Sequence, residues 1–197
     1  MMKQEKITDF IYNFENVLRR DTFFTLSELL TNAEGYHVSD VRPGNSKMTV
    51  KNDLVFGLLA HMREQVFAQI PELQQEGFGW QTLDFQWCNA LAKGPVKEAH
   101  WHTDGKPTEL MIVFYFHHTW REDWNGCLQF DNVDIIPKPN SCVVFPANIH
   151  HRIQPSTLDA QSWRYSVTFP TTVTDQPWRI DCHKINKKLS ELPYVRY

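Results

Sequence analysis

The stretch that decides the fold is Glu109–His118, which reads ELMIVFYFHH. Its middle positions are apolar one after another, so an extended chain here is hydrophobic on both faces. A strand of this kind is expected at the centre of a sheet that is covered on both sides. The stretch therefore predicts a central strand in a layered β structure.

Other short segments on either side of this stretch also have strand patterns, and Gly, Pro, Asn and Asp turns separate them. These segments are Thr82–Leu91, Cys127–Phe130, Ser141–Phe145, His151–Gln154 and Trp163–Phe169. About six to eight short strands that follow a block of helices predict a β-sandwich or barrel with helices packed on one outer face.

The first part of the chain has helical patterns. Apolar residues over Ile7–Leu18 recur at the spacing of one helix face, and Asp21 is a plausible N-cap for a short helix over Phe24–Leu30. A longer helix is expected from about Asn52 to Ile70, ending before a proline. The residues expected on its buried side are Leu54, Leu58, Leu59, Met62 and Val66.

Composition limits the class of protein. The chain has 197 residues, a net charge of −3, 42% hydrophobic residues and 22% charged residues. These values are typical of a soluble globular protein. The near-neutral charge argues against nucleic-acid binding by phosphate neutralisation, and no apolar run is long enough for a membrane helix. We therefore expect neither a nucleic-acid partner nor a membrane.

The organisation expected is a single domain over residues 1–197. It would comprise a helical support region at 1–75, a β core at 80–170 and a C-terminal extension at 171–197 of undetermined role. We find no secretory signal, and the four scattered cysteines have no C-x-x-C spacing, which fits free thiols in a cytoplasmic protein. These cysteines are Cys88, Cys127, Cys142 and Cys182.

A candidate metal site begins at His100–Gly105, which reads HWHTDG. On an extended chain, residues i and i+2 share a face, so His102 and Asp104 point the same way. A second histidine from a distant strand would complete a 2-His-1-carboxylate set, which suits non-haem iron. An isolated H-x-D is weak evidence, because a surface turn often has the same pattern.

Two later segments strengthen this interpretation. In the strand predicted at His151–Gln154, His151 and Ile153 share a face, so the histidine would project inward. Strand residues Arg164 and Ser166 also share a face. A buried arginine is costly unless it meets an anion, so a ligand carboxylate is its expected partner, with the Ser166 hydroxyl as a further donor.

Taken in order, His102-x-Asp104, His151-x-Ile153-x-Pro155 and Arg164-x-Ser166 resemble the Fe(II)/2-oxoglutarate-dependent dioxygenase superfamily. Within it, they resemble the prolyl 4-hydroxylase-like branch. The segment Trp120–Phe130 is similar to that branch's Trp…Gly-Gly-x-Leu segment, with Asn125-Gly126 in place of Gly-Gly. The similarity covers roughly residues 80–169.

The resemblance implies a mainly β fold, a double-stranded β-helix (jelly roll, cupin-like) with the N-terminal helices packed on one sheet. It implies that His102, Asp104 and His151 are the iron ligands. It also implies 2-oxoglutarate as cosubstrate and O2 as oxidant, with hydroxylation of an unactivated C–H bond and release of succinate and CO2.

The resemblance assigns the distal carboxylate of 2-oxoglutarate to Arg164. Tyr115 lies where the family often has a tyrosine that joins this carboxylate, although a core tyrosine is an equally good interpretation. The family's tyrosine on the strand around Asn89 is missing, so the residue that holds the metal-proximal end is open, with Gln86 and Asn89 as candidates.

Alternatives remain at this point. A cupin-type metalloprotein would hold its metal with three histidines and a glutamate, His100, His102, His151 and Glu109, without 2-oxoglutarate. A jelly-roll binding module would use no metal. His150 competes with His151, and the match to H-x-Ile-x-Pro favours His151. His117 and His118 are expected in a turn or on the surface.

The substrate is not readable from the pattern, because the branch includes enzymes that act on prolyl residues of proteins and others that act on small molecules. A peptidyl, including prolyl, substrate and a small-molecule substrate both fit. Tryptophans that could shape a substrate groove are Trp80, Trp87, Trp101, Trp120 and Trp124. Ordinary core or rim packing explains them equally well.

Overall fold

The computed structural model describes residues 1–32, 37–38, 45–49, 52–75, 89–93, 100–106, 108–172 and 180–197. The strands of the larger sheet are β1 (Lys3–Thr8), β2 (Ile11–Glu15), β3 (His37–Val38), β4 (Asn45–Thr49), β5 (Asn89–Lys93), β6 (Glu109–Tyr115), β9 (Ser141–Pro146) and β11 (Arg164–Thr172). Those of the smaller sheet are β7 (Leu128–Phe130), β8 (Val133–Ile135), β10 (Arg152–Ile153) and β12 (Val195–Arg196).

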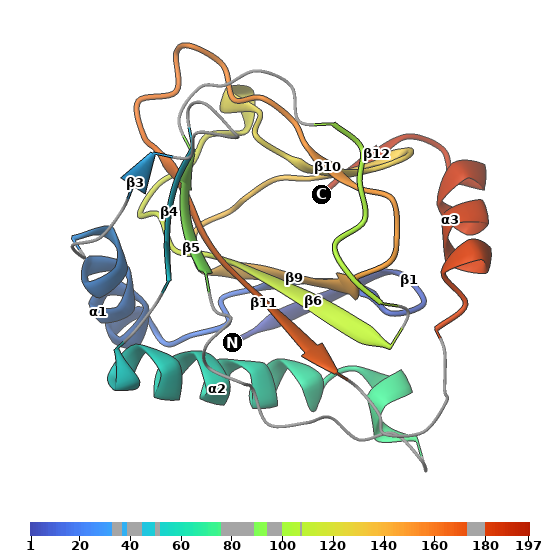
Figure 1. Ribbon diagram of the computed structural model, residues 1–197, viewed down its shortest axis with the longest axis horizontal. Helices are drawn as coiled ribbons and strands as arrows, with labels where there is room; N and C mark the ends of the chain where they lie inside the picture. The colour runs from blue at the N-terminus through green and yellow to red at the C-terminus, as the bar shows by residue number, and fades with distance from the viewer. Residues whose placement is uncertain are drawn as a thin grey trace.

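The two sheets lie one above the other (Figure 1). The larger sheet has the strand order β1-β2-β9-β6-β11-β5-β4-β3, and the smaller sheet has the order β10-β7-β8-β12. Neighbouring strands in the larger sheet are antiparallel, whereas β12 joins β8 in parallel. This mainly β, two-sheet architecture confirms the predicted fold class.

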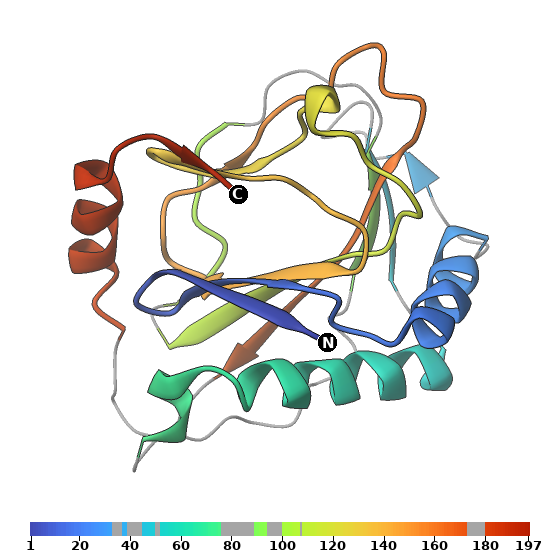
Figure 2. The ribbon, with the colours of Figure 1, turned by 180° about the vertical axis from the view of Figure 1, so that it is seen from behind.

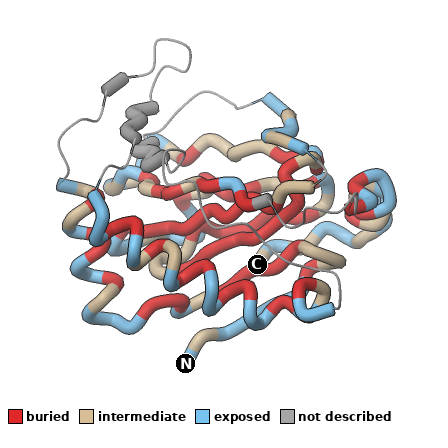
Figure 3. The backbone as a smooth tube through the Cα atoms, turned by 60° about the horizontal axis from the view of Figure 1, so that its bottom comes forward, coloured by how far each residue is buried: buried red, intermediate tan, exposed pale blue. Residues whose placement is uncertain are grey.

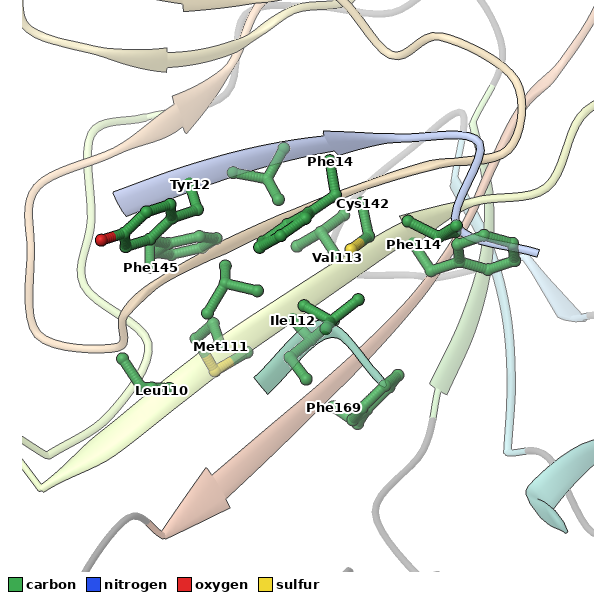
Figure 4. Close-up of a cluster of buried hydrophobic side chains, with 14 of the residues drawn as sticks. Tyr12, Phe14, Leu110, Met111, Ile112, Val113, Phe114, Cys142, Phe145 and Phe169 are labelled. Carbon is green, nitrogen blue, oxygen red and sulfur yellow. The ribbon is translucent and has the colours of Figure 1, made fainter. Parts of the chain in front are cut away.

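Strand β6 lies at the centre of the larger sheet, as its apolar sequence predicts. It pairs with β11 on one side and β9 on the other, and every residue of Leu110–Phe116 is buried. Figure 4 shows its side chains among those of neighbouring strands, and Figure 3 shows the continuous buried band that the sheets form. Burying each large apolar side chain contributes about 1.5–3 kcal/mol, so this strand anchors the fold.

The strands predicted around it are found with small shifts at their ends. Ser141–Phe145 is extended by Pro146, Cys127–Phe130 begins one residue later, and His151–Gln154 is reduced to Arg152–Ile153. The stretch Thr82–Leu91 lies largely outside the described residues, and β5 begins at Asn89. Strands β8 and β12 were not predicted.

The helix predicted over Ile7–Leu18 is wrong, because this segment forms the β1–β2 hairpin. Phe10 adopts a φ of 62°, which turns the chain between the paired residues Thr8 and Ile11. Strand β2 lies between β1 and β9 and is buried at four consecutive residues, Ile11–Phe14. A strand covered on both faces has apolar residues without alternation, and here their spacing matched a helix by coincidence.

The other N-terminal helices are confirmed as helices. Helix α1 spans Arg20–Thr31 with Arg19 as N-cap, so Asp21 is not the cap and lies instead in the first turn. Its carboxylate accepts a hydrogen bond from the Thr22 backbone N–H at 2.8 Å. The region 1–75 is therefore helical only in part, and the division of the chain into support, core and extension remains a prediction.

Helix α2 spans Asp53–Phe67, so it begins one residue later and ends three residues earlier than expected, and a short 3-10 helix, η1 (Pro71–Gln74), follows. The Asn52 side chain caps it by accepting from two backbone N–H groups of the first turn. Of the residues expected on its buried side, Leu59, Met62 and Val66 are buried. Leu58 is only partly buried, and Leu54 is 59% exposed, so the prediction for Leu54 is wrong.

Helix α2 runs along the outer side of the larger sheet, opposite the smaller sheet, in both Figure 1 and Figure 2. Helix α3 (Cys182–Glu191) stands at one end of the two sheets and leads into β12, so the C-terminal extension is an integral part of the fold.

Three cysteines, Cys127, Cys142 and Cys182, are free, as expected, and all three are buried, whereas Cys88 lies outside the described residues. None of the helices described has the length and apolar character needed to span a bilayer.

Candidate metal centre

Two main-chain segments bring the expected metal ligands together. His102 and His151 form an antiparallel bridge in which each backbone N–H donates to the other residue's carbonyl at 3.0 Å. Four residues before His151, the Ala147 carbonyl accepts hydrogen bonds from the N–H groups of Asp104 at 2.8 Å and Gly105 at 3.2 Å. The backbone thus fixes the relative positions of all three candidate ligands without an ion.

The ligand atoms of His102, Asp104 and His151 lie within 4.8 Å of one another. His102 Nε2 is 3.5 Å from Asp104 Oδ1, and His151 Nε2 is 3.2 Å from Asp104 Oδ2. The two imidazole rings have centroids 4.5 Å apart. Two imidazole nitrogens and one carboxylate that converge in this way form the 2-His-1-carboxylate donor set that suits Fe(II).

The second nitrogen of each imidazole is fixed by the chain itself. His102 Nδ1 donates to the carbonyl of His100 at 2.8 Å, and His151 Nδ1 donates to that of Ile149 at 3.0 Å. A carbonyl oxygen only accepts, so each Nδ1 donates a proton to it and each Nε2 is the nitrogen left to bind an ion. This is the tautomer that a metal ligand needs.

The centre is enclosed on one side and open on the other. The His151 side chain is only 4% exposed, and it packs between Phe145 of the larger sheet and Phe130 of the smaller one. The His102 and Asp104 side chains are 30% and 33% exposed. The site therefore lies between the sheets, near the surface, where a substrate can approach it.

His150 does not join the centre. It is exposed, and its ring stacks on Trp101 with the centroids 6.1 Å apart. Successive residues of an extended chain point to opposite faces, so only one of the neighbouring histidines faces inward. The structure places His151 there, as the sequence favours.

The cupin-type ligand set is not assembled. Within the described part of the chain, the one group of three or more possible metal ligands is His102, Asp104 and His151. Glu109 instead accepts a hydrogen bond from the Lys106 backbone N–H at 3.2 Å. A Cβ on Gly105 would lie 2.3 Å from a Glu109 carboxylate oxygen, so a larger residue in this turn would displace the Glu109 side chain.

Arg164 lies at the start of β11 and is 1% exposed. One terminal nitrogen donates to the Tyr115 hydroxyl at 3.2 Å, and the guanidinium lies 5.0 Å from the centre of the Tyr115 ring. Its Nε and Nη1 are buried and have no hydrogen-bond partner among the residues that the structure describes. Unsatisfied buried donors on a cation are costly, and an anionic carboxylate is the acceptor that would satisfy them.

Ser166 and Tyr115 belong to the same pocket. Ser166 is two residues from Arg164 on β11, so the two side chains share a face, and Ser166 is opposite Tyr115 in the strand pairing. Both residues are fully or almost fully buried. Burial, the largest influence, raises the pKa of the Tyr115 hydroxyl, so it stays a neutral hydrogen-bonding group.

Gly126 lies against the Arg164 side chain. From the sequence alone, this glycine was noted only as part of the Asn125-Gly126 pair that replaces Gly-Gly. Its φ is +75°, and a Cβ there would lie 2.9 Å from the Trp120 ring and 3.4 Å from Arg164 Cδ. Asn125 has a positive φ of 55°, and its carbonyl accepts from Trp120 Nε1 at 2.9 Å. The Asn-Gly pair thus lets the backbone approach the arginine closely.

His117 was expected in a turn or on the surface, and that expectation is wrong. It is 1% exposed behind Tyr115 and Trp120, with Nε2 2.6 Å from the Pro137 carbonyl oxygen. Burial lowers the pKa of its imidazole to about 4. His118 is on the surface, as expected.

Other expected site residues differ in their placement. Trp101 is 37% exposed beside the centre, whereas Trp124 is buried against Trp120 and cannot line a groove. Trp80, Gln86 and Trp87 lie outside the described residues, as does the side chain of Asn89. The residue that would hold the metal-proximal end of a cosubstrate is therefore not placed.

Comparison with known proteins bears on this geometry. The family model of the 2OG-Fe(II) oxygenase superfamily matches residues 88–169, which contain the three candidate ligands and Arg164. The resemblance found in the sequence is thus confirmed. No curated protein matches the chain.

Solved structures with the same fold include oxygenases of different specificity. A Pseudomonas putida prolyl-4-hydroxylase is 19% identical, with 86% of this chain and 94% of that chain covered and a TM-score of 0.61. A Trichoplax adhaerens prolyl hydroxylase, in complex with a hypoxia-inducible-factor peptide, is 13% identical, with 94% and 89% covered and a TM-score of 0.60. HygX from Streptomyces hygroscopicus, with nickel, 2-oxoglutarate and hygromycin B bound, is 10% identical, with 95% and 92% covered and a TM-score of 0.62. These similarities confirm the double-stranded β-helix fold.

Proposed function

We propose that this chain is an Fe(II)- and 2-oxoglutarate-dependent oxygenase over its whole length, and that it hydroxylates an unactivated C–H bond with release of succinate and CO2. The observation that carries the proposal is a pair of complementary sites between the sheets. One is the donor set of His102, Asp104 and His151, and the other is the buried Arg164 with two unsatisfied N–H donors.

The donor set fits a ferrous ion. His102 and His151 would bind it through Nε2, because both Nδ1 atoms already donate to main-chain carbonyls. Asp104 would add the negative charge and the third bond. Three ligands on one face of a six-coordinate ion leave the other positions for a cosubstrate and O2. The bound iron and 2-oxoglutarate would supply the oxidising chemistry.

Arg164 would hold the distal carboxylate of 2-oxoglutarate. Its Nε and Nη1, which have no hydrogen-bond partner among the described residues, are donors that an anionic carboxylate would satisfy. The Tyr115 hydroxyl, which accepts a hydrogen bond from Arg164, is free to donate its own proton to the same anion, and the Ser166 hydroxyl is a further donor. These residues act by binding and orientation and transfer no proton.

Enclosure determines where the substrate approaches. The aromatic rings of Phe130 and Phe145 keep water from the inner side of His151, whereas His102 and Asp104 are about one-third exposed. We propose that the substrate reaches the centre from this exposed side. The substrate class proposed is a peptide with a prolyl residue or a small molecule, in the cytoplasm.

Succinate formation tests the proposal. The full chain is incubated with Fe(II), 2-oxoglutarate and either air or argon, and succinate is measured. We expect succinate only under air with added iron, and none from Asp104→Ala. The control is His150→Ala, because His150 adjoins His151 but points away, and it should behave as the wild type. Succinate without iron, or equal amounts from Asp104→Ala, would contradict the proposal.

The substrate is then sought by mass. Peptides and small molecules from a cell lysate are incubated with the wild type or with Asp104→Ala, and products heavier by one oxygen atom are identified. A product formed only by the wild type assigns the substrate class.

A further inference from the structure

Strand β10, which follows His151, consists of only two residues, Arg152 and Ile153. It pairs with β7 through Arg152–Gln129 and Ile153–Leu128. On its other side, the bridge between His102 and His151 is the main-chain contact found among the described residues. The bridge sets the backbone of the histidine, and in so short a strand the side chains add further contacts that hold this position.

A row of hydrogen-bonded side chains crosses the smaller sheet from this strand. We name it the outer-face ladder, and it consists of Arg152, Gln129, Asp134 and Tyr194. Arg152 Nε donates to Gln129 Oε1, Gln129 Nε2 donates to Asp134 Oδ1, and the Tyr194 hydroxyl donates to Asp134 Oδ2. Each of these distances is 2.8 Å.

Strand pairing explains why the ladder forms on the outer face. His151 points inward to Phe145, so the next residue, Arg152, points outward. Gln129 is paired with Arg152 and also with Asp134. Directly paired residues of neighbouring strands share a face, so the three side chains lie in a row.

The chemistry of the ladder permits a single arrangement. Arg152 can only donate and the Asp134 carboxylate can only accept, so the amide of Gln129 must turn its oxygen to the arginine and its nitrogen to the aspartate. The row thus joins a cation to an anion through one amide, and hydrogen bonds to charged groups are the strong ones. Asp134 is 4% exposed, so losing a donor there is costly.

The C-terminal segment provides the last member of the ladder. Strand β12 pairs with β8 at the opposite edge of the smaller sheet from β10 (Figure 1). Val195 N–H donates to the Asn132 carbonyl and Tyr197 N–H to the Asp134 carbonyl, both at 2.9 Å. These bonds hold the backbone that follows Tyr194, and the Asn132 side chain donates to the Leu192 carbonyl before it at 3.0 Å. The Tyr194 hydroxyl is thereby kept on the carboxylate.

At its other end, the ladder contacts Trp101, the residue that precedes His102. The Arg152 guanidinium lies 4.8 Å from the centre of the Trp101 ring, a cation–π contact. Trp101 directly precedes His102, and Arg152 directly follows His151. The ladder therefore ends against residues that adjoin both histidines of the candidate centre.

We infer that Tyr194 and Gln129 are positioning residues of the metal centre, which act on His151 through Arg152. The C-terminal segment would in this way hold the edge strand of the smaller sheet in the geometry that the ion requires. The inference rests on the proposed function, because it concerns the same centre.

The test measures affinity for Co(II) in the absence of O2, followed by the visible absorption of the bound ion. Tyr194→Phe and Gln129→Met remove ladder hydrogen bonds with little change of shape. We expect each to raise the dissociation constant about 3- to 10-fold, less than the 10- to 100-fold typical of direct partners of ligands. Tyr197→Phe is the matched control, because the Tyr197 hydroxyl has no hydrogen bond within the described chain, and it should leave the affinity unchanged.

A double-mutant cycle separates positioning from a loss of stability. In an Arg152→Met background, the ladder no longer reaches His151, so Tyr194→Phe should have no further effect on Co(II) affinity. Equal affinity of the wild type, Tyr194→Phe and Gln129→Met would overturn the inference, as would an undiminished effect of Tyr194→Phe in the Arg152→Met background. A wild type that binds no Co(II), or that binds it as well after His151→Ala, would instead overturn the proposed function.

Discussion

His102 and His151 exchange two main-chain hydrogen bonds of 3.0 Å, so the histidines of the candidate centre belong to one short bridge between distant parts of the sequence. Main-chain bonding at this point fixes the histidines before any ion arrives. Asp104 joins them through its N–H, which donates to the Ala147 carbonyl at 2.8 Å. The protein thus supplies a preorganised face of three ligands.

Asp104→Asn should abolish tight metal binding and leave the fold intact. The amide keeps the shape of the side chain but has no negative charge. Because the Asp104 side chain is 33% exposed, the substitution should lower the stability only a little. We expect the Fe(II) dissociation constant, measured by anaerobic titration, to rise at least about 10- to 100-fold. Wild-type affinity in this variant would exclude Asp104 as a ligand, and His150→Ala is the control that should bind normally.

Arg164→Met should abolish binding of 2-oxoglutarate without lowering the stability of the free protein. The guanidinium has two buried N–H groups without partners, and replacing a poorly paired buried charge with an apolar side chain is often neutral or stabilising. Thermal unfolding is measured with and without 2-oxoglutarate in the presence of Mn(II). At about 100 times the dissociation constant, the ligand should stabilise the wild type by about 2.7 kcal/mol. The same stabilisation of Arg164→Met would show that the anion binds elsewhere.

Gly126→Ala should destabilise the protein by about 1–3 kcal/mol, because the residue has a positive φ and a Cβ would contact Trp120 and Arg164. The KM for 2-oxoglutarate should rise as well, since the new methyl group displaces the arginine. Gly57→Ala is a matched control, because that helical glycine faces open space and should gain about 0.5–1 kcal/mol. Similar urea midpoints for the two variants would contradict this account of the pocket wall.

His117 should make the protein sensitive to acid. Burial lowers the pKa of its imidazole from 6.5 to about 4. Below about pH 6.5, the unfolded chain takes up a proton on this ring, whereas the folded protein does so only near pH 4, so the free energy of unfolding falls as the pH drops through this window. The loss is on the order of 3 kcal/mol.

Urea denaturation across this pH range checks the effect, with His117→Gln for comparison. The glutamine keeps a donor for the Pro137 carbonyl but cannot titrate. The stability difference between wild type and variant should therefore shift in favour of the variant as the pH falls. A difference that is independent of pH would show that another group is responsible.

Sequence reasoning located the candidate centre because its signals are local. The i, i+2 spacing in His102-Thr103-Asp104 fixes a shared face, and the order of motifs indicates which distant strand supplies the third ligand. Arg164 was found in the same way, from strict alternation in β11. The apolar run of β6 likewise identified the central strand.

The errors arose where long-range contacts decide the structure. The β1–β2 hairpin was mistaken for a helix because β2 lies inside the sheet, between β1 and β9, and is buried on both faces, so its apolar residues do not alternate. His117, two residues after the end of β6, is buried because its ring packs against those of Tyr115 and Trp120, and nothing in its own segment indicates this. The outer-face ladder depends on the register of four strands and could not be inferred from any one of them.

A crystal structure with Mn(II) and 2-oxoglutarate tests the central claim most directly. We predict one ion bound by His102 Nε2, His151 Nε2 and an Asp104 carboxylate oxygen, with the distal carboxylate of 2-oxoglutarate on the Arg164 guanidinium. An ion bound away from these three side chains, or an Arg164 guanidinium without the carboxylate while 2-oxoglutarate is bound, would contradict the account.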